Sequence, residues 1–240
     1  MRKGIFTAIA MIFWAFFTIH VNAFSLDDMA IENDQLRIAY LTFDDGPSIY
    51  TEAILDVLLE KEVPGIFFVL GDNMKHLPQT DRIFDRLINE GHFIALHSMS
   101  HNKHQLYWKS DAPQVFVNEM KELQQLVADK TGHETFLCRA PYGKRGHFKP
   151  AHKIALNEAN FYCVDWHVDS LDWAKRRADA IVTQVQENLA QLDDSQKEVV
   201  FLFHEYGRTA EALPIIIDYL RDEGFVFATY VEGHRFEKLN

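Results

Sequence analysis

Cysteine, glycine and proline are all scarce in this chain, and each scarcity excludes a class of protein. Two Cys among 240 residues are too few for a disulfide-stabilised small domain or for a cysteine-rich zinc module. Eleven Gly and seven Pro give neither a collagen-like repeat nor a low-complexity linker. The remaining composition, 48% hydrophobic and 25% charged, is typical of a globular protein with a buried core.

Positive charge is also in short supply. The 24 Lys and Arg residues are outnumbered by 35 Asp and Glu residues, which gives a net charge of −11 at pH 7. Proteins that bind nucleic acid use clustered Lys and Arg to displace counterions from the phosphates. The charge therefore argues against a nucleic-acid partner.

One uncharged apolar run stands near the start of the chain. The basic pair Arg2 and Lys3 precedes it, and it ends near Val21-Asn22-Ala23. A basic start, an apolar centre and small residues before a cut are typical of a secretory signal, and the run is short for a membrane span. We predict a signal peptide over residues 1–23 and a secreted or periplasmic protein with no stable membrane insertion after cleavage. An uncleaved anchor is the alternative.

Residues 24–240 repeat one pattern, in which a short apolar or β-branched run is followed by turn residues and then by apolar positions at helical spacing. Strands that alternate with helices predict βαβ units, right-handed crossovers and a parallel sheet. Seven such units suit a barrel or an open doubly wound sheet. Because no linker divides them, we predict a single α/β domain. The strands are expected at Arg37–Phe43, Gly65–Leu70, Phe93–His97, Thr135–Arg139, Phe161–Trp166, Glu198–Phe203 and Phe225–Thr229.

Reactive side chains follow these strands at their carboxyl ends, where active sites gather in parallel α/β folds. Asp44 and Asp45 come directly after the first apolar strand and precede Gly46-Pro47. A simple turn before a helix is one interpretation, because Asp-Gly-Pro is common in turns. Adjacent side chains on an extended chain point to opposite sides, however. One carboxylate can then bind a cation while the other accepts a proton from water.

Two His residues follow the third predicted strand. His97 and His101 are four residues apart, so that one helical turn would place both rings on the same face. With one Asp they form a ligand set that leaves coordination positions open for water and substrate. We expect one divalent metal ion per chain, with Zn²⁺ as the default and Co²⁺, Ni²⁺, Mn²⁺ or Fe²⁺ as alternatives. Other His residues are interpreted as structural or surface residues: His92, His104, His133, His147 and His152.

Five short motifs, in their order along the chain, resemble those of one family. The chain is similar over residues 38–230 to the polysaccharide deacetylases with NodB homology, the family 4 carbohydrate esterases. The run Ile94-Ala95-Leu96-His97-Ser98-Met99-Ser100-His101 is most similar to the peptidoglycan N-acetylglucosamine deacetylase branch. The resemblance implies a distorted (β/α) barrel, which agrees with the seven predicted units. The motifs are Thr42-Phe43-Asp44-Asp45-Gly46-Pro47, His97-Ser98-x-x-His101, Arg139-Ala140-Pro141-Tyr142-Gly143, Asp169-Ser170-Leu171-Asp172-Trp173 and Leu202-Phe203-His204.

Carried over position by position, the resemblance implies the roles of the first matching side chains. Asp44 would be the general base, and Arg139 would hold and orient it. Asp45, His97 and His101 would be the metal ligands.

The later motifs supply the rest of the implied site. His204 would be the general acid, and the carboxylate of Asp172 could fix its tautomer. Tyr142, Pro141 and Trp173 would bind the substrate, and the backbone N–H of Tyr142 would help to stabilise the oxyanion. Trp173 would support the far side of the pocket together with Asp172, and its ring suits stacking on a sugar.

Some of these residues have a competing structural interpretation. Arg139 could form a surface salt bridge, and Trp173 could pack in the core. Glu205 departs from the family pattern, in which a smaller or differently placed polar residue often follows the acid. Cys138 and Cys163 lie in consecutive predicted strands, where the sequence is compatible both with a disulfide and with two free thiols.

The sequence therefore predicts a metal-dependent hydrolase that removes N-acetyl groups from N-acetylglucosamine residues of a peptidoglycan-type or chitin-type glycan. We expect a monomer whose partner is the acetylated polysaccharide or oligosaccharide. A hydrolase of a non-sugar amide or an O-acetyl ester could use the same groups. A catalytically inactive carbohydrate-binding module is a further alternative, but such a module needs a stacking surface rather than six ionisable groups.

Overall fold

The computed structural model of the chain describes residues 36–239. The predicted signal peptide, residues 1–23, and the predicted start of the domain at residue 24 lie outside the described residues. Gln35–Asn240 forms one compact unit by its internal contacts, which agrees with the prediction of a single domain.

The described strands form one sheet in which every pairing is parallel. Their order is β5-β4-β3-β2-β1-β7-β6, and β8 pairs with the beginning of β1. The apolar runs are buried on both faces, as expected where helices cover a parallel sheet. The strands are β1 (Arg37–Gly46), β2 (Ile66–Val69), β3 (Phe93–Leu96), β4 (Leu137–Cys138), β5 (Tyr162–Cys163), β6 (Val168–Asp169), β7 (Glu198–His204) and β8 (Phe225–Phe227).

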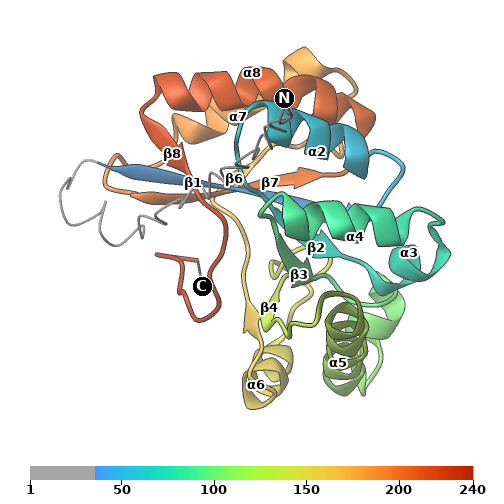
Figure 1. Cartoon of the computed structure of the whole chain (residues 1–240). Coiled ribbons are helices and arrows are strands. Elements are labelled where there is room, and N and C mark those ends of the chain that lie inside the picture. The colour runs from blue at the N-terminus through green and yellow to red at the C-terminus, as the bar shows by residue number, and fades with distance from the viewer. Residues whose placement is uncertain (1–35, 240) are drawn as a thin grey trace, which may run out of the picture. The chain divides into compact units, whose positions relative to one another are not determined.

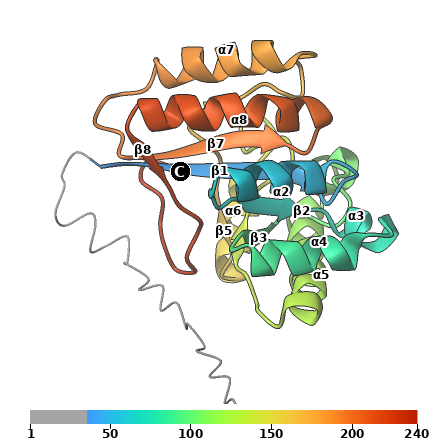
Figure 2. The same cartoon turned by 45° about the horizontal axis from the view of Figure 1, so that its top comes forward.

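Helices connect most of the strands and lie outside the sheet. Figure 1 shows α2, α7 and α8 along one side, with α5 and α6 at the other end, and Figure 2 shows α4 between α2 and α5. The apolar positions expected to face the core, such as Phe116 and Ile181, are buried. Within residues 36–239 the helices are α2 (Thr51–Glu60), α3 (Gly71–His76), α4 (Thr80–Asn89), the π-helical η1 (His104–Trp108), α5 (Ala112–Thr131), α6 (Pro150–Glu158), α7 (Ala178–Leu189) and α8 (Gly207–Asp222).

The sheet differs from the prediction at its two outer strands. All seven predicted strands are present, but the fifth spans only Tyr162–Cys163, and an eighth strand, Val168–Asp169, follows it without an intervening helix. This added strand pairs with β7, and its two residues are too few for a hydrophobic period. The outer strands β5 and β6 do not pair with each other among the described residues. The curled sheet is therefore an open, distorted barrel.

Stacked aromatic rings fix the middle of the sheet. Phe43 lies between Phe67 and Phe203, with ring centroids 4.9 and 5.7 Å away, and all three are fully buried. Burying each such ring contributes about 1.5–3 kcal/mol. The same packing sets the register of β1 and β7, in which Asp44 is the partner of His204. The core therefore brings the base and acid predicted from two distant motifs to the same edge.

No helix of residues 36–239 combines the length and the apolar character that crossing a membrane requires.

Candidate active site

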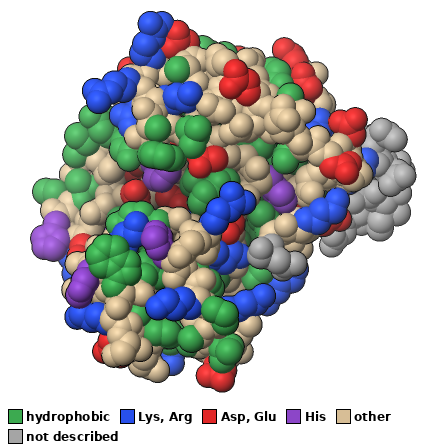
Figure 3. Space-filling view, turned by 180° about the vertical axis from the view of Figure 1, so that it is seen from behind, with side chains coloured by type: hydrophobic (Ala, Val, Ile, Leu, Met, Phe, Trp, Pro, Cys, Tyr) green, Lys and Arg blue, Asp and Glu red, His purple; other side chains and the backbone are tan. Residues whose placement is uncertain are grey.

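The carboxyl ends of the strands surround a cavity of about 400 Å³. Its lining comes from the ends of six strands and the segments that follow them, and includes Asp44, His97, Tyr142, Trp173 and His204. Figure 3 shows a hollow on this side in which acidic and His side chains are surrounded by hydrophobic ones. All five sequence motifs thus meet here although they are far apart along the chain.

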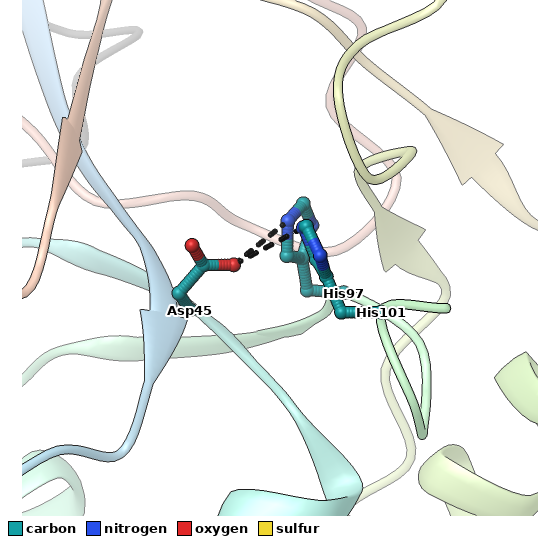
Figure 4. Close-up of side chains that lie close together, drawn as sticks. All are labelled: Asp45, His97 and His101. Atoms are coloured by element: carbon teal, nitrogen blue, oxygen red, sulfur yellow. Dashed lines mark ion pairs between the residues drawn. The ribbon is translucent and has the colours of Figure 1, made fainter. Parts of the chain in front are cut away.

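Asp45, His97 and His101 come together on one side of the cavity, and both rings point toward the Asp45 carboxylate (Figure 4). Asp45 Oδ1 lies 3.4 Å from Nε2 of each His, and one ligand atom from each residue lies within 4.8 Å of the others. His97 Nδ1 lies 3.0 Å from the carbonyl of Arg139. If Nδ1 carries the proton for this bond, Nε2 is left free to bind a cation.

The two His rings do not meet through a helical turn, as their spacing suggested. Residues 97–101 form a bend in which Ser98 and His101 have φ values of 90° and 53°. The His101 N–H donates to Ser98 Oγ at 3.0 Å, which stabilises the bend. Left-handed backbone at non-glycine residues is costly and occurs where the surroundings hold it, often at functional sites.

These three side chains fit a divalent cation. Asp45 Oδ1 is buried and has no hydrogen-bond partner. Burial acts to raise the pKa of Asp45, but the adjacent His97 side chain, with the charges of His101 and His204, holds it well below its usual range. Burial and the neighbouring His97 lower the pKa of His101. An ionised carboxylate and neutral imidazoles are the protonation states that bind metals.

Asp44 is held by a buried guanidinium. Arg139 Nη1 donates to Asp44 Oδ1 at 2.8 Å and to Thr42 Oγ1 at 2.7 Å, and Nη2 donates to the carbonyl of Asp165 at 3.0 Å. The Arg139 guanidinium also packs 4.1 Å from the centre of the Phe68 ring. Arg139 has 0% exposure, so the interpretation as a surface salt bridge is wrong. Breaking such a buried pair from one side costs about 3–5 kcal/mol.

His204 and Asp172 form a second buried pair across the cavity. The Asp172 carboxylate accepts hydrogen bonds at 2.7 Å from the His204 N–H and from Thr209 Oγ1, and its other oxygen lies 2.7 Å from His204 Nδ1. Burial acts to lower the pKa of His204, but the hydrogen bond and charge of Asp172, helped by the charges of Asp44 and Asp45, raise it to about 9. His204 is therefore protonated near neutral pH.

Two of the three predicted substrate-binding residues line the cavity, and the third does not. Trp173 lines the cavity and is 56% exposed, so the interpretation as a core residue is wrong. Tyr142 also lines the cavity, and its ring centre lies 4.4 Å from that of His101. Pro141 does not line this cavity; it is buried, and its carbonyl accepts a hydrogen bond from Tyr107 at 2.7 Å.

The structure adds cavity residues that the sequence prediction did not select. Trp166 follows β5 and Asp169 ends β6, and each of these outer strands has only two residues, too few to show a hydrophobic period. Tyr206 stacks on His204, with ring centroids 5.8 Å apart. Because Tyr206 stands two residues after the predicted acid, the sequence could have indicated that both side chains lie on the same side. Leu202, which precedes His204 on the same face of β7, also lines the cavity.

The two cysteines are free thiols. Cys138 and Cys163 are in-register partners on β4 and β5. Burial raises the pKa of Cys138 well above its ordinary value, and the neighbouring Cys163 raises it further.

A curled parallel sheet with reactive groups at its carboxyl edge defines an enzyme of the α/β-barrel class. A family model described as polysaccharide deacetylase matches residues 32–163. The chain belongs to the polysaccharide deacetylase family.

Relatives that are named for their activities support this assignment. A peptidoglycan-N-acetylglucosamine deacetylase of Bacillus cereus is 35% identical over 202 residues, which cover 83% of this chain and 71% of the relative. A chitooligosaccharide deacetylase of Sinorhizobium fredii is 29% identical over 81% of this chain and 91% of its own length. The crystal structure of a polysaccharide deacetylase from Bacillus cereus matches with a TM-score of 0.74 and 34% identity, over 85% of this chain and 96% of that one. The family resemblance, the barrel-type fold and the enzyme class predicted from the motifs are confirmed.

Proposed function

We propose that this chain is an exported, metal-dependent hydrolase that removes N-acetyl groups from N-acetylglucosamine residues of a polysaccharide, with a peptidoglycan-type glycan as the first candidate. The observation that carries the proposal is one cavity that holds three kinds of group: the Asp45, His97 and His101 cluster, the Arg139-bound Asp44, and the Asp172-bound His204. Relatives named as peptidoglycan-N-acetylglucosamine and chitooligosaccharide deacetylases support the substrate class.

Asp45, His97 and His101 would hold the divalent ion, most simply Zn²⁺. When bound, such an ion polarises the acetamide carbonyl and makes water a better nucleophile. Asp44 then accepts the proton of the attacking water. Arg139 keeps the Asp44 carboxylate in place by a hydrogen bond to Oδ1, so that Oδ2 can accept the proton.

The remaining steps also fall to residues of this chain. The N–H of Tyr142 is proposed to donate to the oxyanion that forms during amide cleavage. Protonated His204 donates its proton to the departing amine, which is otherwise a very poor leaving group. The Asp172 carboxylate contacts Nδ1 of His204, which leaves Nε2 free to transfer the proton. The exposed ring of Trp173 supplies an apolar face for a sugar.

Export is part of the proposal. Residues 1–23 would be removed as a signal peptide and residues 24–240 would form the exported catalytic domain, because the N-terminal sequence has the charge and apolar pattern of a secretory signal.

Product analysis on three kinds of substrate tests the proposed function. Purified protein is incubated with peptidoglycan, with acetylated chitooligosaccharides and with a small non-sugar acetamide, each with and without a chelator. Acetate release from a glycan that the chelator abolishes supports the proposal. Release from the small acetamide alone identifies a different amidase. Binding of glycan without any acetate identifies an inactive carbohydrate-binding protein.

Metal content gives a separate prediction. The protein is expected to bind close to one Zn²⁺ or Co²⁺ ion per chain after the metal-free form is titrated, because three ligand atoms converge. His97→Ala should lose this binding, as measured by elemental analysis. His104→Ala is the matched control, because His104 is exposed and contacts Trp108 rather than the cavity. Equal metal content in wild type and His97→Ala would contradict the assigned ligands.

A further inference from the structure

Glu205 directly follows His204, but its side chain does not line the cavity. It is buried against the loop between β1 and α2. Its Oε2 accepts a hydrogen bond from the Ser48 N–H at 3.0 Å and contacts the Thr51 hydroxyl. Its carbonyl accepts from Ser48 Oγ at 3.2 Å, and its N–H donates to the carbonyl of Asp44 at 3.3 Å. Glu205 therefore joins the end of β7 to the loop that follows the two adjacent carboxylates.

The second carboxylate oxygen explains why the last residue of β1 is a glycine. Glu205 Oε1 is buried without a hydrogen-bond partner, and a Cβ atom at Gly46 would lie only 1.8 Å from it. Gly46 does not have a positive φ, so lack of space rather than backbone conformation requires glycine here. The carboxylate and the bare Cα of Gly46 thus fit against each other directly beside Asp45.

Asp45 needs such support because its backbone is strained. Its φ is 69°, a region that non-glycine residues occupy only when their surroundings hold them there. The Asp45 carbonyl accepts a hydrogen bond from Asn73 Nδ2 at 2.8 Å. Glu205 holds the chain on both sides of Asp45, because its N–H donates to the Asp44 carbonyl and its carboxylate accepts from the Ser48 N–H.

The loop that carries His97 and His101 rests on a second glutamate in the same way. Glu119 of α5 uses Oε2 to accept hydrogen bonds from the backbone N–H groups of Met99 (3.1 Å) and Ser100 (2.9 Å). Its Oε1 accepts from Ser100 Oγ at 2.8 Å. These contacts lie inside the bend formed by residues 97–101.

We propose that Glu205 and Glu119 are positioning residues for the metal ligands: Glu205 for the end of β1, which carries Asp45, and Glu119 for the bend that carries His97 and His101. Each carboxylate accepts hydrogen bonds from backbone N–H and hydroxyl groups of its segment, and these bonds hold the segment in one conformation. Neither side chain lines the cavity, so each acts through the loop and not on the substrate. The inference rests on the proposed function of Asp45, His97 and His101 as a metal site.

Metal affinity in paired variants tests the proposal. Co²⁺ is titrated into metal-free protein and followed by its visible absorption, and the melting temperature is measured alongside. Glu205→Ala and Glu119→Ala should each weaken Co²⁺ binding about 10- to 100-fold. Glu205→Gln and Glu119→Gln keep the side-chain length and one acceptor oxygen, so these variants should bind Co²⁺ nearly as tightly as wild type. Burial raises the pKa of Glu205 to about 7, so a neutral replacement is tolerable near neutral pH.

A control and a double variant separate positioning from general stability. Glu122→Ala, on the same helix as Glu119 but ion-paired with Lys75 at the surface, should leave Co²⁺ affinity unchanged. Gly46→Ala should weaken Co²⁺ binding by displacing the Glu205 carboxylate. Combined with Glu205→Ala, it should add little further loss, because the two changes disrupt the same contact.

Several outcomes overturn the proposal: wild-type Co²⁺ affinity in both Ala variants, Gln variants as weak as the Ala variants, or additive losses for Gly46→Ala and Glu205→Ala. Wild-type protein that binds no Co²⁺ overturns it together with the metal site. The proposed deacetylation is judged separately by acetate release. Expected Co²⁺ affinities without acetate from any glycan would leave the positioning role standing and remove the proposed function.

Discussion

Asp44→Asn is expected to lower kcat about 10²- to 10⁴-fold on an acetylated glycan. The physical reason is that an amide cannot accept the proton of the attacking water, whereas the Asp44 carboxylate lines the cavity and can. The amide oxygen can still accept the hydrogen bond from Arg139, which the carboxylate now accepts at 2.8 Å. The variant should therefore stay folded and keep its metal, as circular dichroism and elemental analysis would report.

The neighbouring carboxylate provides the contrast. Asp45→Asn should weaken metal binding first, because a neutral amide oxygen is a poorer ligand than a carboxylate. Asp179→Asn is the control, since Asp179 is exposed and pairs with Arg177 at the surface, so this variant should keep its turnover. Metal loss in Asp44→Asn with metal retained in Asp45→Asn would mean that the two roles are exchanged.

His204→Ala is expected to retain bound metal and to lose about 10²- to 10⁴-fold in kcat on an acetamide. The amine that leaves must be protonated, and His204 lies across the cavity from the proposed metal ligands with its Nδ1 held by Asp172. An activated acetate ester needs little protonation of its leaving group. Its hydrolysis should therefore suffer much less, and comparison of the two substrates in one kinetic assay is the measurement. Equal losses on both substrates would contradict the role of His204 as the acid.

The pH profile offers an independent check on the same residue. The acid form of His204 is required, and its pKa is about 9, so kcat/KM should fall as the pH rises through this range. Asp172→Asn removes the charge that raises the pKa, while the lowering effect of burial remains. The alkaline limb of the profile should then move to lower pH. An unchanged limb in Asp172→Asn would assign that ionisation to another group.

The succession of strands along the chain and the identity of the reactive side chains could be predicted from the sequence because both depend on local pattern. An apolar run followed by turn residues marks a buried strand and its exit, whatever lies elsewhere in the chain. Asp44 and His204 each stand at such an exit, and the parallel arrangement brings both exits to one edge. The family motifs added roles to these positions. The two-residue β6 carried no period, so it could not be predicted.

What the sequence by itself determined is therefore the parallel α/β class, the polysaccharide deacetylase family and the residues at which its chemistry was to be sought. The tertiary structure decided how those residues meet: His97 and His101 approach through a left-handed bend and not a helical turn, and Arg139 is buried against Asp44. It also decided that Glu205, which had only departed from a pattern, lies beneath the loop of Asp45. The reason is that hydrophobic period and turn chemistry act over a few neighbouring residues. Hydrogen bonds such as that between Arg139 and Asp44, or between Glu205 and Ser48, join residues 95 and 157 positions apart, and only the packed core sets their geometry.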